Sequence, residues 1–315
     1  MDKKKPYALV FGVSIFDICG FTYDNYRVND SNPGKVKTSF GGVCRNIAEC
    51  MARVGVNTRL ISVLGDDSTG NSMIEHSKLM KYDMKDSLIV KGGNTPTYMA
   101  ILNEEGEMVS AVVDMKIIQD VTTEFIDSKE EIIENAQLVV VDSDRPDLIE
   151  YMIHKFKGSK FILDPVSAHK AKDIRHLIKY FHTVKPNRYE AEIMCGFEIK
   201  TKQDLQKAGR YLIELGVKNV FITLDEDGIY YYNGIDEGKI KAQNAKVVNV
   251  TGAGDSFIAG ITRGYMEKIN IVDTVKYAIS MSIITISTEE TIHPQLNDDL
   301  VKEYINSIDW AEEKY

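Results

Sequence analysis

Five short apolar runs, separated by segments with helical periodicity, constrain the fold of this 315-residue chain most strongly. Each run is nearly continuously apolar, as expected for a strand that is buried on both faces. Several of the periodic segments end in glycine, which is typical of helices. The alternation predicts right-handed βαβ units and an α/β fold, with a mainly parallel central sheet flanked by helices. The runs are Tyr7–Ile15, Thr58–Gly65, Ala136–Ser143, Lys160–Pro165 and Asn219–Gly228.

Two stretches interrupt this alternation, at residues 21–40 and 95–115. In the second, Asn-Glu-Glu-Gly separates two apolar runs and predicts a hairpin. Neither stretch has a helix to cover it, so we expect them to pair as a small projecting β-sheet; two ordinary surface loops are the alternative. The predicted lid comprises residues 19–40 and 95–115, and the predicted core comprises residues 1–18, 41–94 and 116–315.

Composition excludes several classes of function. The net charge of −9 is unfavourable for non-specific binding to nucleic acid, which needs clustered Lys and Arg. No apolar stretch is long enough to span a bilayer, and Asp17 interrupts the only run that resembles a signal peptide. The four cysteines form no C-x-x-C pair and the six histidines are scattered, so we expect reduced thiols in the cytoplasm and no zinc site.

A glycine-rich turn near the C-terminus carries the clearest chemical signal. Residues 246–260 read KVVNVTGAGDSFIAG, which predicts a strand, a turn of small residues and an apolar helix. Backbone N–H groups at the start of such a helix form an anion hole, and Asp255 could accept a proton from an attacking hydroxyl. Phosphoryl transfer needs positioning, charge neutralisation and a base. Alternatively, Asp255 only caps the helix and the glycines only form a tight turn.

Three motifs resemble the signatures of the ribokinase-like (PfkB) sugar and nucleoside kinases, in the order and at the spacing of that family. Residues 41–55 resemble its N-terminal signature, residues 185–196 its N-x-x-E element, and residues 249–260 its C-terminal signature. The resemblance runs through most of the chain. It implies an ATP-dependent kinase with a three-layer ribokinase-like fold and a small β-sheet lid.

Longer strings resemble the pseudouridine kinase branch of the family, and imply phosphorylation of the 5′-hydroxyl of pseudouridine. Another acceptor, such as ribose, a nucleoside or a sugar phosphate, is the alternative within the family. A non-catalytic nucleoside or sugar sensor on the same fold is the alternative outside catalysis. An NAD-dependent Rossmann enzyme is excluded, because no G-x-G-x-x-G follows the first predicted strand. The strings are residues 30–49, 95–115, 163–175 and 184–192.

The resemblance also implies roles for residues around the acceptor. Asp255 would be the catalytic base, and the anion hole would consist of Gly252, Ala253 and Gly254. Asp17, expected at the end of the first strand (Ala8–Phe16), would bind ribose hydroxyls; a turn residue is the alternative. Arg45 would face the base or a phosphate, with a surface salt bridge as the alternative, and Asn46 would bind hydroxyls or cap a helix. The remaining predicted substrate residues are Gly41, Gly42 and Asp164.

The same resemblance implies roles for the residues that would bind ATP and Mg²⁺. Glu190 and Asn187 would hold Mg²⁺ through water, although the pair also fits a helix-capping box. Lys185 would contact nucleotide or phosphate, with a solvated surface lysine as the alternative. The other predicted nucleotide-binding residues are Thr223 and Gly228, and Asp225 between them departs from the glycine that is common in the family.

Two further expectations concern a monovalent cation and a partner subunit. Many family members carry aspartate where this chain has Asn249, and that carboxylate helps to bind an activating cation. We therefore expect weak K⁺ dependence. Lids of relatives often pair with the lid of another subunit, and the apolar residues Tyr98, Met99 and Ile101 need cover, so a homodimer through the lid is expected.

Overall fold

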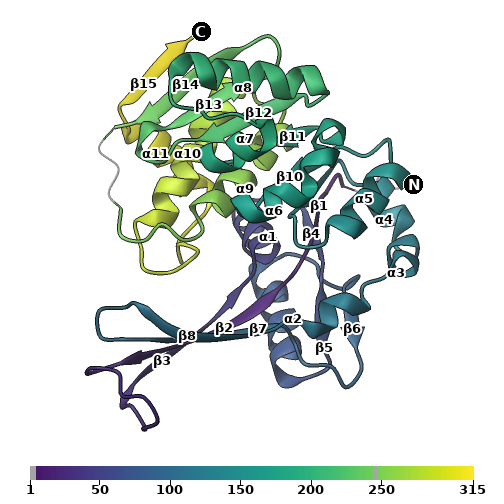
Figure 1. Ribbon diagram of the computed structural model, residues 1–315. Helices are drawn as coiled ribbons and strands as arrows, with labels where there is room; N and C mark the ends of the chain where they lie inside the picture. The colour runs from purple at the N-terminus through teal and green to yellow at the C-terminus, as the bar shows by residue number, and fades with distance from the viewer. Residues whose placement is uncertain (1–4, 244–246) are drawn as a thin grey trace.

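The computed structural model describes residues 5–243 and 247–315, and its main feature is a nine-stranded sheet (Figure 1). The six strands from β4 to β12 pair in parallel, as predicted, whereas the three strands beyond β12 pair antiparallel at one edge. In order across the sheet, the strands are β15 (Trp310–Lys314), β14 (Glu237–Ala242), β13 (Ile229–Tyr232), β12 (Asn219–Thr223), β11 (Thr183–Val184), β10 (Phe161–Leu163), β9 (Leu138–Val141), β1 (Ala8–Phe11) and β4 (Thr58–Ile61).

Helices cover both faces of this sheet, because neighbouring side chains of each buried strand point to opposite faces. Ala8 and Val10 join one core with α1 (Val43–Arg53), α2 (Ser68–Met80), α9 (Ala253–Met266), α10 (Ile271–Ile286) and α11 (Asp298–Ser307). Leu9 and Phe11 join the other core with α3 (Thr123–Asp127), α4 (Glu130–Glu134), α5 (Pro146–Lys155), α6 (Ala168–Ile174), α7 (Arg188–Cys195) and α8 (Lys202–Leu215). In the described ranges, no helix meets the length and hydropathy that a membrane crossing requires.

A separate four-stranded sheet projects from the core, as predicted for the lid (Figure 1). Its order is β3 (Gly34–Gly41), β2 (Ile15–Thr22), β7 (Thr97–Leu102) and β8 (Met108–Asp114), so β3 and β8 form its edges. The predicted hairpin joins β7 to β8, and the N–H of Asn103 donates to the carbonyl oxygen of Glu107 at its turn. All seven residues of β8 are exposed.

The first predicted strand is divided between the two sheets. β1 ends at Phe11 in the large sheet, and β2 begins at Ile15 in the small sheet. The division occurs because the N–H of Phe16 donates to the carbonyl oxygen of Pro96, at 2.7 Å, which starts the pairing with β7. The small sheet therefore begins four residues before the expected boundary at residue 19. The run at 58–65 is likewise divided, and its second half forms β5 (Val63–Gly65), which pairs with β6 (Leu88–Val90).

Candidate active site

The glycine-rich turn lies at the amino end of α9, facing the carboxyl ends of the parallel strands. Gly252 is the N-cap residue of α9, with φ of 80° in the left-handed region. A side chain at this position would collide with the carbonyl oxygen of Thr291, so glycine is required both for the backbone angle and for the close approach. The first N–H groups of a helix have no intrahelical acceptor, and here they include those of the predicted anion hole. The N–H of Ala253 makes a long hydrogen bond, of 3.4 Å, to the carbonyl oxygen of Val250 in the turn.

The segment before the turn is not the strand that its β-branched residues suggest. Residues 247–250 lie outside any strand, and Val247, Val248 and Val250 are exposed. The N–H groups of Val248 and Asn249 both donate to the carbonyl oxygen of Ile286, at the end of α10, rather than to a neighbouring strand. The start of the expected strand, Lys246, lies outside the described residues.

Asp255 is the third residue of α9 and does not cap the helix, so the capping alternative is wrong. Its Oδ2 accepts a hydrogen bond from the side-chain amide of Asn46, at 2.8 Å, across 209 residues of sequence. Burial, reinforced by the carboxylate of Asp164, raises the pKa of Asp255 to about 7, although Asn46, Lys185 and Arg45 act in the opposite direction. A carboxylate with a pKa near the working pH is well matched to accept a proton and later release it.

A buried ion pair lies beside the turn. Lys185 directly follows β11, Asp164 directly follows β10, and their charged groups are 3.0 Å apart. Burial alone would lower the pKa of Lys185, but Asp164 and Glu190 outweigh it, so the pKa is raised and the ammonium stays charged. The side chain of Lys185 is only 7% exposed, so the surface-lysine alternative is wrong. A Cβ atom on Gly254 would lie 2.8 Å from this ammonium, which places the cation directly against the turn.

The N-x-x-E element forms the capping box that its spacing allows. The N–H of Glu190 donates to Oδ1 of Asn187, at 2.9 Å, and Oε2 of Glu190 accepts from the N–H of Asn187, at 2.8 Å. Glu190 is buried, and burial raises its pKa although Lys185 lowers it. The backbone of Asn187 also forms an isolated bridge with that of Thr223 on β12, so these two predicted nucleotide residues lie side by side.

The acceptor side is built where the lid joins the core. Asp17 lies within β2, not at the end of a core strand as expected, because the first strand is divided. Its carboxylate occupies the space that a side chain on Gly41 would fill. Gly42 caps α1 with φ of 93°, and a Cβ there would lie 2.5 Å from the carbonyl oxygen of Val13. Burial raises the pKa of Asp17 to about 6, against the charge of Arg45.

Asn46 and Arg45 both lie inside α1. Asn46 is not a helix cap, because α1 begins at Val43, so that alternative is wrong. The guanidinium of Arg45 is buried and pairs with Glu49, so its salt bridge is not a surface one. Contact of Arg45 with the base or a phosphate stays a prediction.

The loop after β12 holds Asp225 in a backbone conformation that glycine adopts readily. Asp225 has φ of 50°, in the left-handed region that favours glycine and that aspartate tolerates better than most residues. Gly228 has φ of 89°, and a side chain there would collide with the carbonyl oxygen of Ile240. Among the described residues, no hydrogen bond or ion pair joins Thr223 or Gly228 to Asp255, and their nucleotide role stays a prediction.

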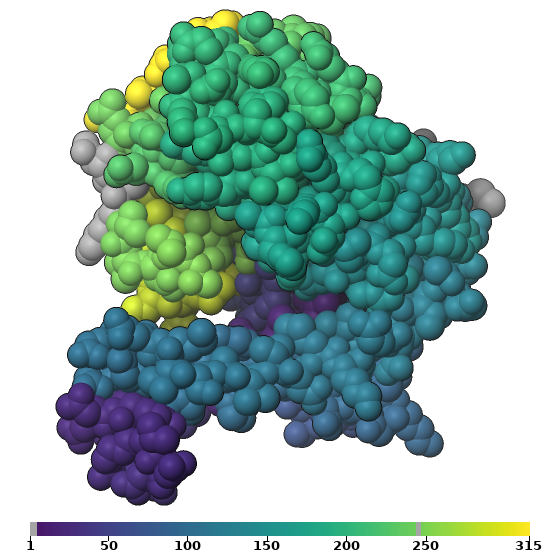
Figure 2. Space-filling view, in the orientation of Figure 1, coloured from purple at the N-terminus to yellow at the C-terminus, as the bar shows by residue number. Residues whose placement is uncertain are grey.

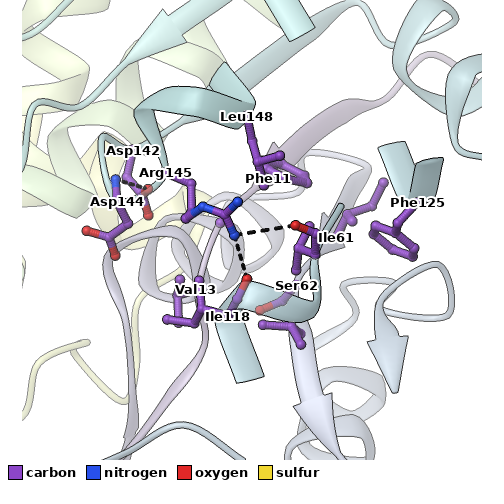
Figure 3. A pocket seen from close by; sticks show the side chains of 13 residues that line it. Phe11, Val13, Ile61, Ser62, Ile118, Phe125, Asp142, Asp144, Arg145 and Leu148 are labelled. Atoms are coloured by element: carbon purple, nitrogen blue, oxygen red, sulfur yellow. Dashed lines mark hydrogen bonds between the residues drawn. The ribbon is translucent and has the colours of Figure 1, made fainter. Parts of the chain in front are cut away.

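Sequence reasoning missed Asp142, which follows β9 as Asp164 follows β10. Burial and the nearby carboxylate of Asp144 raise the pKa of Asp142 to about 7. Both lie beside a cavity of about 30 Å³, and Figure 3 shows them with Arg145 opposite Phe125. This cavity has room for about one water molecule, so it cannot receive a nucleoside. The signal that could have identified Asp142 is its position at the carboxyl end of a parallel strand.

Figure 2 shows the lid projecting below the core, with the surface hollowed between them. The profile described as "pfkB family carbohydrate kinase" matches residues 5–298. The chain belongs to the PfkB family of carbohydrate kinases. As a PfkB carbohydrate kinase, it is an ATP-dependent phosphotransferase. Family membership confirms the interpretation, made from the three sequence motifs, that the chain is a PfkB kinase.

One curated relative and two solved structures are similar to this PfkB kinase over almost the whole chain. It is 31% identical to a pseudouridine kinase of Escherichia coli K12, over 94% of this chain and 95% of the relative. A crystal structure from Clostridium perfringens, provisionally called a sugar kinase, is 58% identical and has a TM-score of 0.96 over 99% of both chains. Arabidopsis thaliana ribokinase, solved with ribose and ATP, is 20% identical with a TM-score of 0.82, over 95% of this chain and 98% of that one. These matches confirm the ribokinase-like α/β fold with its small separate sheet.

Proposed function

We propose that this PfkB kinase transfers the γ-phosphoryl group of ATP to the 5′-hydroxyl of pseudouridine, giving pseudouridine 5′-phosphate and ADP. The observation that carries the proposal is Asp255, with a pKa near 7, at the mouth of a glycine-lined helix and hydrogen-bonded to Asn46. The similarity to a pseudouridine kinase over almost the whole chain supports the acceptor.

In the proposed reaction, the Asp255 carboxylate takes the proton of the acceptor hydroxyl as its oxygen attacks the γ-phosphorus. The new oxygen–phosphorus bond forms while the bond from the γ-phosphorus to the bridging oxygen breaks, and ADP leaves with the electron pair. The N–H groups of Gly252, Ala253 and Gly254 would stabilise the charge on the transferring group. Lys185 lies against Gly254, so its ammonium would neutralise charge at the same place.

The donor set fits a Mg²⁺ ion that is bound largely through water. Mg²⁺ keeps several waters and takes few protein carboxylates. Glu190 offers a buried carboxylate with one oxygen already used in the capping box, and Asn187 offers only an amide. Among the described residues, no group of three or more His, Cys, Asp or Glu side chains could form a protein cage for a metal. When bound there, Mg²⁺ would neutralise phosphate charge.

The predicted acceptor residues Asp17, Asn46 and Asp164 would bind the ribose of the acceptor. Two of the three lid cations that could bind a phosphate group on the acceptor are already paired. Lys37 pairs with Glu289, at 3.2 Å, and Arg27 pairs with Asp30, at 3.3 Å. Lys35 forms no ion pair among the described residues, so a sugar phosphate stays the alternative acceptor.

The substrate panel is the direct test of this function. Purified enzyme with ATP and Mg²⁺ should give its highest kcat/KM with pseudouridine, compared with uridine, ribose, adenosine and fructose phosphates. ADP release, measured by a coupled assay, reports turnover. Absence of turnover with pseudouridine but turnover with another acceptor would replace the acceptor and keep the kinase. Tight nucleoside binding without ADP release would instead favour the sensor.

Weak dependence on K⁺ is expected from the contacts of Asn249. Its side-chain NH₂ donates to the carbonyl oxygen of Glu289, at 3.2 Å, and its Oδ1 accepts from the N–H of Thr251, at 3.0 Å. A neutral amide used in this way offers no charge to a cation. Titration of KCl against choline chloride at fixed ionic strength should therefore change kcat little, whereas Asn249→Asp should gain activation by K⁺. Strong activation of the wild-type enzyme would contradict the expectation.

We also propose a cytoplasmic homodimer that pairs through the lids. The apolar side chains of the lid support a partner there: Val112 is 68% exposed, Met108 62% and Met99 44%, whereas Tyr98 and Ile101 are half-buried. Apolar surface of this kind on a projecting sheet favours association. Sedimentation at micromolar concentration would measure the oligomeric state.

A further inference from the structure

Two arginines and a histidine converge on one buried carboxylate beneath the lid. Glu49, on α1, accepts from Arg45 at 2.6 Å, from Arg53 at 2.7 Å and from His76 at 2.9 Å. Its side chain is 3% exposed. Burial alone would raise the pKa of Glu49, but Arg45 and the other partners outweigh it, so the pKa is lowered and the carboxylate stays charged. Such a carboxylate anchors its arginines firmly, because buried charge without a partner is costly.

Only one of these arginines reaches toward the proposed base. Nη2 of Arg45 donates to Oδ1 of Asn46, at 2.5 Å, while Nη1 of the same guanidinium contacts Glu49. A guanidinium has donors and no acceptor, so it must face the oxygen of the amide and not its NH₂ group. The NH₂ group of Asn46 is thereby turned to the other side, where it donates to Oδ2 of Asp255.

We propose that Arg45, anchored by Glu49, is a positioning residue that fixes the amide orientation of Asn46 and so keeps a hydrogen-bond donor on the Asp255 carboxylate. The proposal rests on the proposed role of Asp255 as the base. Donation from Asn46 stabilises the ionised carboxylate and leaves Oδ1 for the acceptor hydroxyl. If the amide turned over, its oxygen would face the carboxylate instead and would favour the protonated form.

Several charged groups face Asp255 and must be separated from this effect. Asp164, after β10, opposes its ionisation, whereas Lys185, after β11, and Arg45, on α1, favour it. The thiol of Cys50, also on α1, lies near enough for Asp255 to raise its pKa. Arg45 therefore acts both as a charge and through Asn46, and a useful variant must keep the charge while removing the bridge.

Arg45→Lys makes that separation. A lysine keeps the positive charge, but its single ammonium nitrogen cannot replace the two guanidinium nitrogens that contact Glu49 and Asn46. We expect the acid limb of the kcat profile to move to higher pH by about half a unit or more, because Asp255 must lose its proton to act. Because the pKa of Asp255 is about 7, a shift of half a unit to one unit should lower kcat at pH 7 about two- to fivefold, and the KM for ATP should stay unchanged.

Arg53→Lys is the matched control, since it makes the same exchange on the same helix and at the same Glu49 without a contact to Asn46. Its acid limb should coincide with that of the wild-type enzyme. Glu49→Asp is the second variant: it keeps the charge, withdraws the anchor, and should shift the limb as Arg45→Lys does. Thermal melting confirms that each variant is folded.

An acid limb in Arg45→Lys that matches Arg53→Lys, or a Glu49→Asp enzyme with no shift, would overturn the proposal. The Asp255 carboxyl carbon can also be titrated by ¹³C NMR in the free enzyme, with the signal assigned by its loss in Asp255→Asn. This measurement needs no acceptor, so it tests the positioning role even if the substrate panel rejects pseudouridine. In this titration the pKa of Asp255 should be higher in Arg45→Lys than in Arg53→Lys, by the same amount as the acid limbs of the two kcat profiles differ.

Discussion

Asp255→Asn should lower kcat by about 10²- to 10⁴-fold, the range expected when a general base is removed. Asparagine keeps the size of the side chain and can still contact Asn46, but it cannot accept the proton of the acceptor hydroxyl. Binding of ATP and of the acceptor should change little, because the anion hole is backbone and the acceptor contacts lie on other elements. Single-turnover kinetics and calorimetric titration of each ligand would separate the two effects.

The control for this variant is Asp273→Asn, which makes the same exchange at the same position, the third residue, of the neighbouring helix α10. Asp273 has no role in the proposed reaction, so its substitution should leave kcat unchanged. Retention of more than about a tenth of the wild-type kcat by Asp255→Asn would show that the carboxylate is not the base. Unchanged thermal melting would establish that any loss is chemical.

Lys185→Met should lower the free energy of unfolding by about 3–5 kcal/mol, because it leaves the Asp164 carboxylate buried without its partner. It should also slow turnover at neutral pH. Without the ammonium, the pKa of Asp255 rises further, so less of the base is ionised at pH 7. Denaturation in urea followed by circular dichroism would measure the stability, and a pH profile would measure the shift.

A matched exchange on the surface distinguishes burial from charge. Lys200 pairs with Glu198, but both side chains are more than 70% exposed, so Lys200→Met should cost less than about 1 kcal/mol. Adding Asp164→Asn to Lys185→Met should recover part of the lost stability, since no buried charge then remains. Equal costs for the two lysine variants would contradict the assignment of a structural ion pair.

Local motifs predicted the geometry of two parts of the candidate site, because each lies within a few neighbouring residues. Gly252 and Asp255 share one turn, and the capping geometry of Asn187 and Glu190 follows from their spacing of three. The contact between Asn46 and Asp255 could not be predicted in this way. It depends on α1 packing beside α9, which no pattern within either segment specifies.

The same holds for the fold: features set by neighbouring residues were predicted, and features set by residues distant in sequence were not. Continuous apolar runs predicted five of the six parallel strands, because a strand buried on both faces is apolar along its whole length. The sixth, β11, has only two residues and was not predicted. The division of the run at residues 8–16 was not predicted, because it depends on Pro96, which is remote in sequence. The run at residues 247–250 was wrongly predicted as a strand: its valines are exposed, and its backbone bonds to the end of α10.

The positions of the lid strands along the chain have a consequence for synthesis on the ribosome. All four strands of the small sheet are complete at Asp114, whereas β9, the neighbour that β1 needs in the large sheet, begins only at Leu138. The nascent chain therefore carries all the lid strands, including the exposed edge β8, while the last two thirds of the protein are still to be made. At about 5–20 residues per second, that interval lasts on the order of 10–40 s. Lids on adjacent ribosomes of one messenger RNA could meet during that time.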